Sequence, residues 1–305
     1  MSDMPRLEAI ARDCRVQIIR MLAHAGSGHP GGSLSVIDLV VTLLFGRMRH
    51  DPRRPDWPDR DRLILSKGHA VPALYAAMAQ AGYFSHELLL TLRKLGSPLQ
   101  GHPDRTVLPG IEAATGSLGQ GLSIAVGMAL GLRLAASPAR VYCIVGDGEI
   151  QEGQIWEAAM SAPQLGQPEH PLDNLTVILD YNKIQLDDFV ANIRDLEPVV
   201  AKWQAFGWPV LEIDGHRIDQ VAKALDQAET TRGKPVFIVA HTVKGKGVSF
   251  MENNPEWHGK APKPAEAVAA IREILAVPEA DWPAHLARDA ATRALVDELT
   301  ALGRR

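Results

Sequence analysis

Two short apolar runs, with a helical pattern between them, mark the centre of the chain. Residues 141–145 read Val-Tyr-Cys-Ile-Val and residues 175–179 read Leu-Thr-Val-Ile-Leu, which is typical of strands buried in a parallel sheet. Residues 153–166 between them predict a helix. Parallel strands joined by a helix need roughly 30 residues or more, and their crossover is nearly always right-handed. The pattern therefore predicts a strand–helix–strand unit whose two strands end at the same edge of a sheet.

The same alternation of strand and helix patterns continues along the rest of the chain. Long glycine- and proline-rich loops are predicted at residues 25–34, 96–118 and 242–263. Further strands are predicted at residues 62–65, 210–213 and 236–240. Helices are predicted at residues 7–24, 35–48, 69–81, 86–95, 118–135, 198–206, 217–230, 264–276 and 284–302. This order favours an α/β fold with a mostly parallel sheet and helices on both faces. We expect a single domain over residues 1–305, with its C-terminal helices at about 264–305.

Two glycines in the helix predicted at residues 118–135 lie four positions apart. Gly127 and Gly131 predict close packing against a neighbouring helix rather than a membrane motif. The longest apolar stretch, residues 122–132, is too short to cross a bilayer. Residues 1–8 lack the apolar core of a signal peptide. We therefore expect no membrane segment and a cytoplasmic location.

Composition and charge are those of an ordinary globular protein. The 305 residues are 46% hydrophobic and 22% charged, with a formal net charge of −4, which suits a full hydrophobic core. Because the chain has no long basic run, a nucleic-acid partner is not favoured. Cys14 and Cys143 show no CxxC spacing, which predicts reduced thiols rather than a disulfide or a zinc set.

Polar residues follow the two central apolar runs. Gly146-Asp147-Gly148 comes after the first run and Asn182 after the second, so they should meet at a sheet edge where α/β folds bind ligands. A carboxylate, an amide and a nearby main-chain carbonyl suit Mg²⁺ or Ca²⁺ better than zinc. The glycines leave room for a diphosphate, and the next helix presents its positive end. The pattern favours a metal–diphosphate site, whereas the triplet alone is equally typical of a tight turn.

Four histidines lie in separate loops rich in glycine and proline: His29, His69, His102 and His258. Any one of them alone is typical of a solvated loop, but loops on a rigid scaffold carry most binding and catalytic residues. Zinc is disfavoured because no pair has the short spacing of a zinc site. We interpret the other histidines as structural or surface residues: His24, His50, His86, His170, His216, His241 and His285.

Together these motifs resemble the thiamine diphosphate signature of the transketolase family. Residues 146–153 (GDGEIQEG) are similar to the family's GDG-x-x-QEG. Residues 115–121 (TGSLGQG) resemble its TG-P-LGQG loop, with Ser117 in place of the proline. Its histidine motifs resemble residues 27–31 (SGHPG), 66–70 (SKGHA), 101–103 (GHP) and 257–259 (WHG). The motifs run in the family's order, and their joint match is far more specific than any one alone.

The resemblance implies a thiamine diphosphate-binding fold and assigns residues to its site. The implied metal ligands, for Mg²⁺ with Ca²⁺ or Mn²⁺ as substitutes, are Asp147, Asn182 and the main-chain carbonyl of Ile184. The implied catalytic residues, which would face the thiazolium carbon and the sugar hydroxyls, are His29, His102 and His258. A histidine can donate or accept protons there near neutral pH. The implied cofactor-binding residues are His69, Gly116, Leu118, Gly146, Asp147, Gly148, Glu152, Asn182, Lys244 and His258.

Two of these residues have an alternative interpretation. Glu152 is either an acidic residue favourably placed in the first turn of a helix or, by resemblance, a residue of a subunit interface that links two active sites. Lys244 either faces the diphosphate or is solvated.

The resemblance implies a transferase that moves a two-carbon ketol unit from a ketose to an aldose, either of which can be a sugar phosphate, with the cofactor supplying the carbon chemistry. It covers almost the whole chain but only about half of the family's usual protein. We therefore expect the N-terminal subunit of a split transketolase, inactive without a C-terminal, pyrimidine-binding subunit in an α2β2 assembly. The spacing between Asp147 and Asn182 is a few residues longer than is typical, and residues 167–171 predict a surface insertion.

Three other functions stay open at this point. The alpha subunit of a 2-oxo acid dehydrogenase uses the same cofactor and a similar split, although the early histidine motifs and residues 151–153 fit transketolase better. A synthase that uses pyruvate and a triose phosphate is a closer relative. A non-enzymatic partner that has lost catalysis is the third, and the intact Asp147, Asn182 and loop histidines argue against it.

Overall fold

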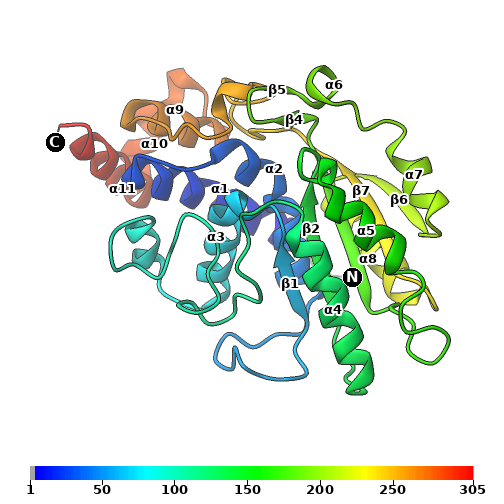
Figure 1. The fold of residues 1–305 in the computed structure, drawn as a ribbon. Coiled ribbons are helices and arrows are strands. Elements are labelled where there is room, and N and C mark those ends of the chain that lie inside the picture. Colours follow the sequence, from blue (N-terminus) through cyan, green and yellow to red (C-terminus); the bar gives the residue numbers. More distant parts are fainter. Residues whose placement is uncertain (1–3, 305) are drawn as a thin grey trace.

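The computed structural model of the protein describes residues 4–304 and has a five-stranded sheet at its centre (Figure 1). All neighbouring strands are parallel. In spatial order the strands are β1 (Arg62–Leu65), β2 (Val141–Gly146), β3 (Leu175–Tyr181), β7 (Val236–His241) and β6 (Val210–Asp214). The register pairs Gly146 with Asp180, and Asp180 with Ala240. The ends of the three middle strands therefore meet at one edge, and the predicted α/β class is confirmed.

Helices cover both faces of this sheet (Figure 1). One core contains residues of α1 (Met4–Ala25), α2 (Pro30–Val41), α3 (Val71–Ala81), α8 (Ile218–Thr230) and α9 (Pro264–Ile274). The other contains residues of α4 (Gln120–Leu134), α5 (Gly153–Ser161) and α7 (Val199–Ala205). Ile144 belongs to the first core and Cys143 to the second, because successive strand residues point to opposite faces. Cys14 and Cys143 are both buried and free, as predicted.

The second helix begins earlier than the sequence predicted. The loop expected at residues 25–34 ends at His29, and α2 begins at Pro30, a position where a missing N–H costs the helix nothing. Gly31 is required inside this helix, because a Cβ atom there would lie 2.8 Å from the carbonyl oxygen of Trp257. After Val41 the chain continues as a π-helix, Thr42–Arg47. The helix predicted at residues 35–48 is therefore wrong in its start and in its geometry.

Other predicted helices are shorter or of a different kind. Residues 86–95 contain a 3₁₀ segment, His86–Thr91, rather than an α-helix, and the helix predicted at residues 153–166 ends at Ser161. Residues 284–302 divide into α10 (Trp282–Arg288) and α11 (Ala290–Leu302), because Asp289 caps the second helix. Short 3₁₀ turns are Gly68–Ala70, Glu149–Gln151, Pro255–Trp257 and Glu279–Asp281. A small hairpin and a helical turn were not predicted: β4 (Ile184–Gln185), β5 (Asp188–Phe189) and α6 (Val190–Ile193).

The glycine pair of α4 does not pack against another helix within residues 4–304. A Cβ atom at Gly127 or Gly131 would meet no atom within 4 Å. The predicted close packing is therefore wrong for the described chain, because these glycines lie on the outward side of α4. Ile124 and Leu134 on the same helix are 38% and 63% exposed. An apolar side of α4 is thus open in the isolated chain.

One helical stretch, Pro30–Arg47, is long and apolar enough to cross a membrane, but 83% of it is buried inside the protein. Its apolar composition follows from its place in the core. This stretch, and not residues 122–132 as expected, is the longest apolar stretch. Residues 167–170 are exposed, as expected for a surface insertion. Residues 1–3 lie outside the described part of the chain; they belong to the N-terminal segment in which no signal peptide is expected. Residue 305, the last residue of the predicted domain, also lies outside it.

Candidate functional site

A cavity of about 310 Å³ lies at the carboxyl ends of the strands. Lys67, Gly146, Asn182 and Lys244 line it, and they follow or end β1, β2, β3 and β7 respectively. The predicted site residues in its wall are His29, His69, Gly116, Leu118, Gly146, Asp147, Gly148, Glu152, Asn182, Ile184, Lys244 and His258. His102 is not among the residues of the wall and is exposed, with its ring centroid 6.2 Å from that of His29. The structure thus brings the predicted residues together at one end of the sheet.

The three predicted metal ligands lie in the turns that follow β2 and β3. The N–H of Gly148 donates to Oδ1 of Asp147 at 2.8 Å, and the N–H of Lys183 donates to Oδ2. Oδ1 of Asn182 accepts the N–H of Ile184 at 3.2 Å. These main-chain bonds fix the directions of the two side chains and leave each oxygen with a further lone pair.

This set of groups fits a divalent cation. Burial and then the neighbouring Asp180 carboxylate raise the pKa of Asp147 to about 6, so a positive charge beside Asp147 would be stabilising. The carbonyl of Ile184 already accepts a cationic group, the Lys244 ammonium, at 2.9 Å. Carboxylate, amide and carbonyl oxygens are hard ligands of the kind that Mg²⁺ prefers. Within residues 4–304 no group of three or more His, Cys, Asp or Glu could hold a metal, so binding would depend on the amide and carbonyl oxygens.

Of the two glycines around Asp147, Gly148 is the one that the surroundings require. A Cβ atom at Gly148 would lie 2.7 Å from Cβ of Gln185, whereas one at Gly146 would make only ordinary contacts, the nearest at 3.5 Å. The tight approach therefore involves the β4–β5 hairpin, which the sequence pattern did not predict.

Three of the predicted histidines form a close cluster in the cavity. The ring centroid of His29 lies 5.3 Å from that of His69 and 5.4 Å from that of His258. The ring centroids of His69 and His258 lie 5.1 Å apart. Burial and then the Arg93 guanidinium lower the pKa of His29 to about 4. Burial and then the Lys244 ammonium lower the pKa of His258 to about 3. These imidazoles are therefore neutral at pH 7, and each can donate one proton and accept another.

The pKa values of His69 and His102 are also lowered by burial and by a neighbouring cation. Burial and then Lys67 lower the pKa of His69 well below its usual value, and burial and then Arg93 lower that of His102. Nδ1 of His29 is buried and has no hydrogen-bond partner in the described chain. A buried polar atom without a hydrogen-bond partner is unfavourable.

Lys244 is buried, which excludes one of its two interpretations. Its side chain is 1% exposed, so the solvated alternative is wrong. Its ammonium lies 2.7 Å from Nδ1 of His258, and because an ammonium can only donate, that nitrogen is the acceptor. The remaining N–H of His258 is therefore on Nε2. Burial and then the Lys67 ammonium lower the pKa of Lys244 to about 8.

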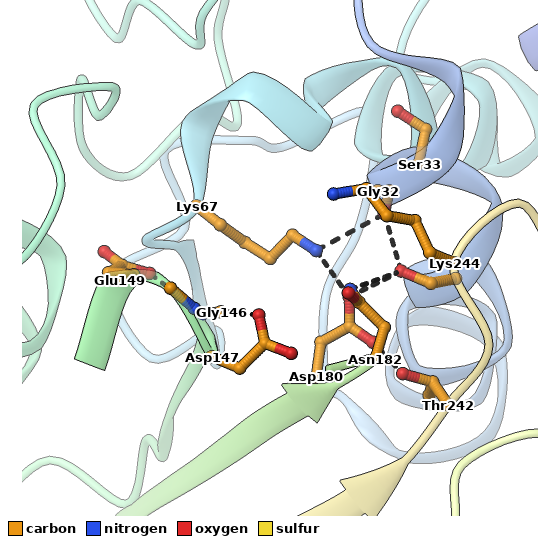
Figure 2. A network of polar contacts seen from close by, with 12 residues as sticks. Gly32, Ser33, Lys67, Gly146, Asp147, Glu149, Asp180, Asn182, Thr242 and Lys244 are labelled. Atoms are coloured by element: carbon orange, nitrogen blue, oxygen red, sulfur yellow. Dashed lines mark hydrogen bonds and ion pairs between the residues drawn. The ribbon is translucent and has the colours of Figure 1, made fainter. Parts of the chain in front are cut away.

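A buried ion pair beneath the predicted ligands was missed by the sequence analysis. Lys67 is 2% exposed and Asp180 is fully buried, and they form an ion pair. Figure 2 shows the two side chains pointing toward each other next to Asn182. Asp180 also accepts hydrogen bonds from Ser35 at 2.6 Å, from Thr242, and from Nδ2 of Asn182 at 3.3 Å. Burial would raise the pKa of Asp180, but Lys67 and the hydroxyl donors lower it below its usual value.

Asp180 therefore orients a predicted metal ligand. By accepting the Asn182 Nδ2 group, it directs the amide oxygen away from itself and toward the cavity. Lys67 stands in the motif at residues 66–70 and Asp180 two positions before Asn182, but a pairing between positions so far apart leaves no periodic signal in the sequence.

Glu149 is a second buried carboxylate that sequence reasoning missed. It is 2% exposed and accepts the N–H groups of Gly119 and Gly146, each at 3.0 Å, and the hydroxyl of Ser66. These contacts join the loop before α4 to the ends of β1 and β2. Its position directly after the GDG triplet was the one sequence feature that could have pointed to a role for Glu149 in the site.

The rim of the cavity is open and partly apolar. Glu152 is exposed and is the N-cap residue of α5, where it makes no capping hydrogen bond, and an acidic side chain at this end of a helix agrees with the dipole interpretation. Leu186 and Phe189 of the hairpin, and Ile193 of α6, are 60%, 40% and 48% exposed. Leu186 is itself part of the cavity wall, so the site borders an apolar surface.

Residues 7–284 match the family described as transketolase, thiamine diphosphate binding domain. The chain is 46% identical over 268 residues to the 6-deoxy-6-sulfo-D-fructose transketolase subunit SqwG of Clostridium sp. (strain MSTE9), covering 88% of this chain and 96% of that protein. It is 39% identical over 268 residues to one of the subunits of the apulose-4-phosphate transketolase of Phocaeicola vulgatus, with 88% and 93% covered.

Solved structures give the same result for the fold. Transketolase from Leishmania mexicana superposes with a TM-score of 0.84 at 30% identity, covering 100% of this chain and 46% of that chain. Transketolase from Campylobacter jejuni superposes with a TM-score of 0.83 at 33% identity, covering 99% and 48%. The chain thus spans about half the length of these solved proteins.

Proposed function

The chain belongs to the transketolase family, as the N-terminal subunit of a split transketolase, and on this premise we propose that it binds Mg²⁺ and thiamine diphosphate in the cavity at the end of its sheet. In a two-subunit complex it would transfer a two-carbon ketol unit from a ketose to an aldose. The observation that carries the proposal is the convergence of separate loops, from His29 to His258, on one cavity.

The chain's own groups can hold such a cofactor. Asp147, Asn182 and the Ile184 carbonyl would bind the metal, and Lys244 and His69 would meet the diphosphate. Each of these five residues lines the cavity. When bound, thiamine diphosphate supplies a nucleophilic carbon and an electron sink.

Proton transfers would fall to His29, His102 and His258. The depressed pKa values of these histidines keep them neutral at pH 7. A neutral imidazole can accept a proton from a hydroxyl and can hydrogen-bond a developing alkoxide, and it avoids the cost of burying a charge.

A partner protein would complete the site. Apolar side chains are exposed beside the cavity, at Leu186 and Phe189, and along α4, at Ile124 and Leu134. Three relatives of nearly the same length are called subunits. The partner that we propose is a C-terminal, pyrimidine-binding subunit, in an α2β2 assembly with Glu152 at the interface. The soluble fold of the relatives and two free thiols support a cytoplasmic location.

The substrate class follows from the relatives' names. They act, as named, on 6-deoxy-6-sulfo-D-fructose and on apulose-4-phosphate, both of which are ketoses with a strongly anionic group. We propose a ketose phosphate or ketose sulfonate as donor and an aldose, such as an aldose phosphate, as acceptor. A sugar donor rather than a 2-oxo acid distinguishes this function from those of the related thiamine enzymes.

The test is a ketol-transfer assay of the purified chain with thiamine diphosphate and Mg²⁺, with and without the partner subunit. We expect turnover of ketose donors by the complex and none by the chain alone, since the partner would supply the pyrimidine-binding half of the cofactor site. Robust turnover without a partner would refute the two-subunit requirement. Turnover of 2-oxo acids but not of ketoses would refute the proposed donor.

A further inference from the structure

A half-buried histidine outside the predicted site joins two walls of the cavity. His216 precedes α8, and its Nδ1 lies 2.8 Å from Oδ2 of Asp38 on α2. Its Nε2 accepts the main-chain N–H of Val243 at 2.8 Å. The side chains of His216 and Asp38 are 13% and 6% exposed. His216 therefore bridges α2, whose first turn reaches the cavity at Gly32, and the loop that follows β7.

These contacts select a single tautomer of His216. A main-chain N–H can only donate, so Nε2 is unprotonated and the ring proton is on Nδ1, where it is donated to Asp38. Arg15 binds the same carboxylate through both terminal nitrogens, at 3.0 and 2.5 Å, and the N–H of His216 donates to Asp214 at 2.9 Å. The imidazole is thus fixed from two sides, with Nδ1–H donated to Asp38 and the Nε2 lone pair accepting the Val243 N–H of the loop.

The loop held by His216 carries Lys244. The N–H of Gly245 donates to the carbonyl of Gly31 at 3.0 Å, so the loop is attached to α2 directly at Gly31 and indirectly through His216. Between these two attachments the Lys244 ammonium lies 2.9 Å from the Ile184 carbonyl oxygen. Loss of either attachment would weaken the hold on the segment that places this ammonium in the cavity. The segment is also bonded through the Thr242 N–H to the Tyr181 carbonyl and through the Lys244 carbonyl to the Asn253 N–H.

We propose that His216 is a positioning residue for the cofactor site: fixed by Asp38, it holds loop 242–245 so that Lys244 meets the diphosphate. The inference rests on the proposed function, because that function puts a diphosphate in the cavity. Removing the imidazole leaves the Val243 N–H without its acceptor in a half-buried place, and unpaired groups of this kind drive local rearrangement.

The experiment compares His216→Leu and His216→Gln with the unaltered two-subunit enzyme. Leu removes the acceptor, whereas the Gln amide oxygen can reach the position of Nε2 and accept the Val243 N–H. Amide hydrogen exchange at Val243 is measured in the cofactor-free enzyme, and the affinity for thiamine diphosphate with Mg²⁺ by calorimetry. For His216→Leu we expect faster exchange at Val243 and an affinity about tenfold lower, since one unmet buried hydrogen bond is worth about that factor. His216→Gln should recover most of the loss.

A matched control is His241→Leu, because His241 lies beside the same loop but its side chain is 43% exposed and touches only Glu212 in the described ion pairs. It should change neither measurement. In the assembled enzyme His216→Leu should raise the cofactor concentration needed for half-maximal rate and leave kcat at saturation unchanged. Lowered thermal stability with unchanged affinity and unchanged Val243 exchange would overturn the inference. If the unaltered enzyme binds no cofactor, the proposed function fails, while exchange at Val243 still decides whether His216 holds the loop.

Discussion

Removing one partner of the buried ion pair between Lys67 and Asp180 should strongly destabilise this fold, because the other charge would be left in the interior. Replacing Lys67 by Met keeps the length and apolar character of the stem but removes the ammonium. The Asp180 carboxylate, which is fully buried, would then stay charged without its cation. Removing one partner of a buried pair typically costs about 3 to 5 kcal/mol, because the remaining charge is uncompensated.

The structure places the expected loss near the lower end of that range. Asp180 keeps three other donors in Lys67→Met, namely Ser35, Thr242 and Asn182, and each hydrogen bond to a charged group is worth about 1.5 to 3 kcal/mol. We therefore expect Lys67→Met to lower the free energy of unfolding by about 3 kcal/mol. The double variant Lys67→Met/Asp180→Asn should lose less than the single one, because no isolated charge remains.

Urea unfolding at pH 7 measures these differences, and a buried indole provides the signal. Trp203 is fully buried and stacks on Phe237 of β7 at 3.7 Å, so its fluorescence reports loss of the central sheet. Lys94→Met is the matched control, since Lys94 is exposed and surface substitutions usually stay within about 0.5 kcal/mol. A loss below about 1 kcal/mol for Lys67→Met, or a double variant less stable than the single one, would refute the reasoning.

Three further predictions concern the site and its rim. Asp147→Ala should abolish Mg²⁺-dependent binding of thiamine diphosphate in the assembled enzyme, as measured by calorimetry. In NMR titrations of the cofactor-free protein, His29 and His258, with pKa values of about 4 and 3, should stay neutral down to about pH 5. Because the unfolded chain protonates these rings at their ordinary, higher pKa, stability should fall as the pH drops below about 6.5. Ile124→Glu and Leu134→Glu should weaken the two-subunit assembly in sedimentation velocity.

Each of these has an outcome that contradicts it. Asp187→Ala, an exposed carboxylate on the nearby hairpin, is the control for Asp147→Ala, and equal affinities of the two variants would show that the metal ligand is misassigned. Protonation of His29 or His258 above pH 6 would mean that the cavity is more hydrated than its geometry indicates. An assembly unaffected by charges on α4 would show that the partner binds elsewhere.

The central sheet could be predicted because its strands carry an unmistakable signal. Residues 141–145 and 175–179 are continuous apolar runs, and the structure makes them β2 and β3 with all their residues buried. The start of α2 could not be predicted, because its glycines resemble a loop. Gly31 is in fact required by the close approach of the Trp257 backbone, a contact between segments more than 200 positions apart.

The site residues, like the fold, divide into those that the sequence could predict and those that it could not. Glycine-flanked motifs predicted His29, His69 and His258, which the structure brings into one cluster, but only the resemblance to a family suggested that they converge. Lys67 lies in one of these motifs and Asp180 directly after the apolar run that became part of β3, yet their ion pair could not be foreseen, since local patterns do not reveal which strand ends become neighbours. Lys244 stayed ambiguous because burial of a lysine is decided by tertiary packing.

The wall of the cavity joins stretches of chain that are remote from one another, from His29 near the start to His258 near the end. A ligand in this cavity would stabilise the whole fold, because it binds only the folded chain, in which these stretches lie together. At a free concentration one hundred times its dissociation constant, such a ligand adds about 2.7 kcal/mol to the resistance against unfolding. The supply of thiamine diphosphate should therefore govern how long the protein resists proteolysis, as well as how fast the enzyme works.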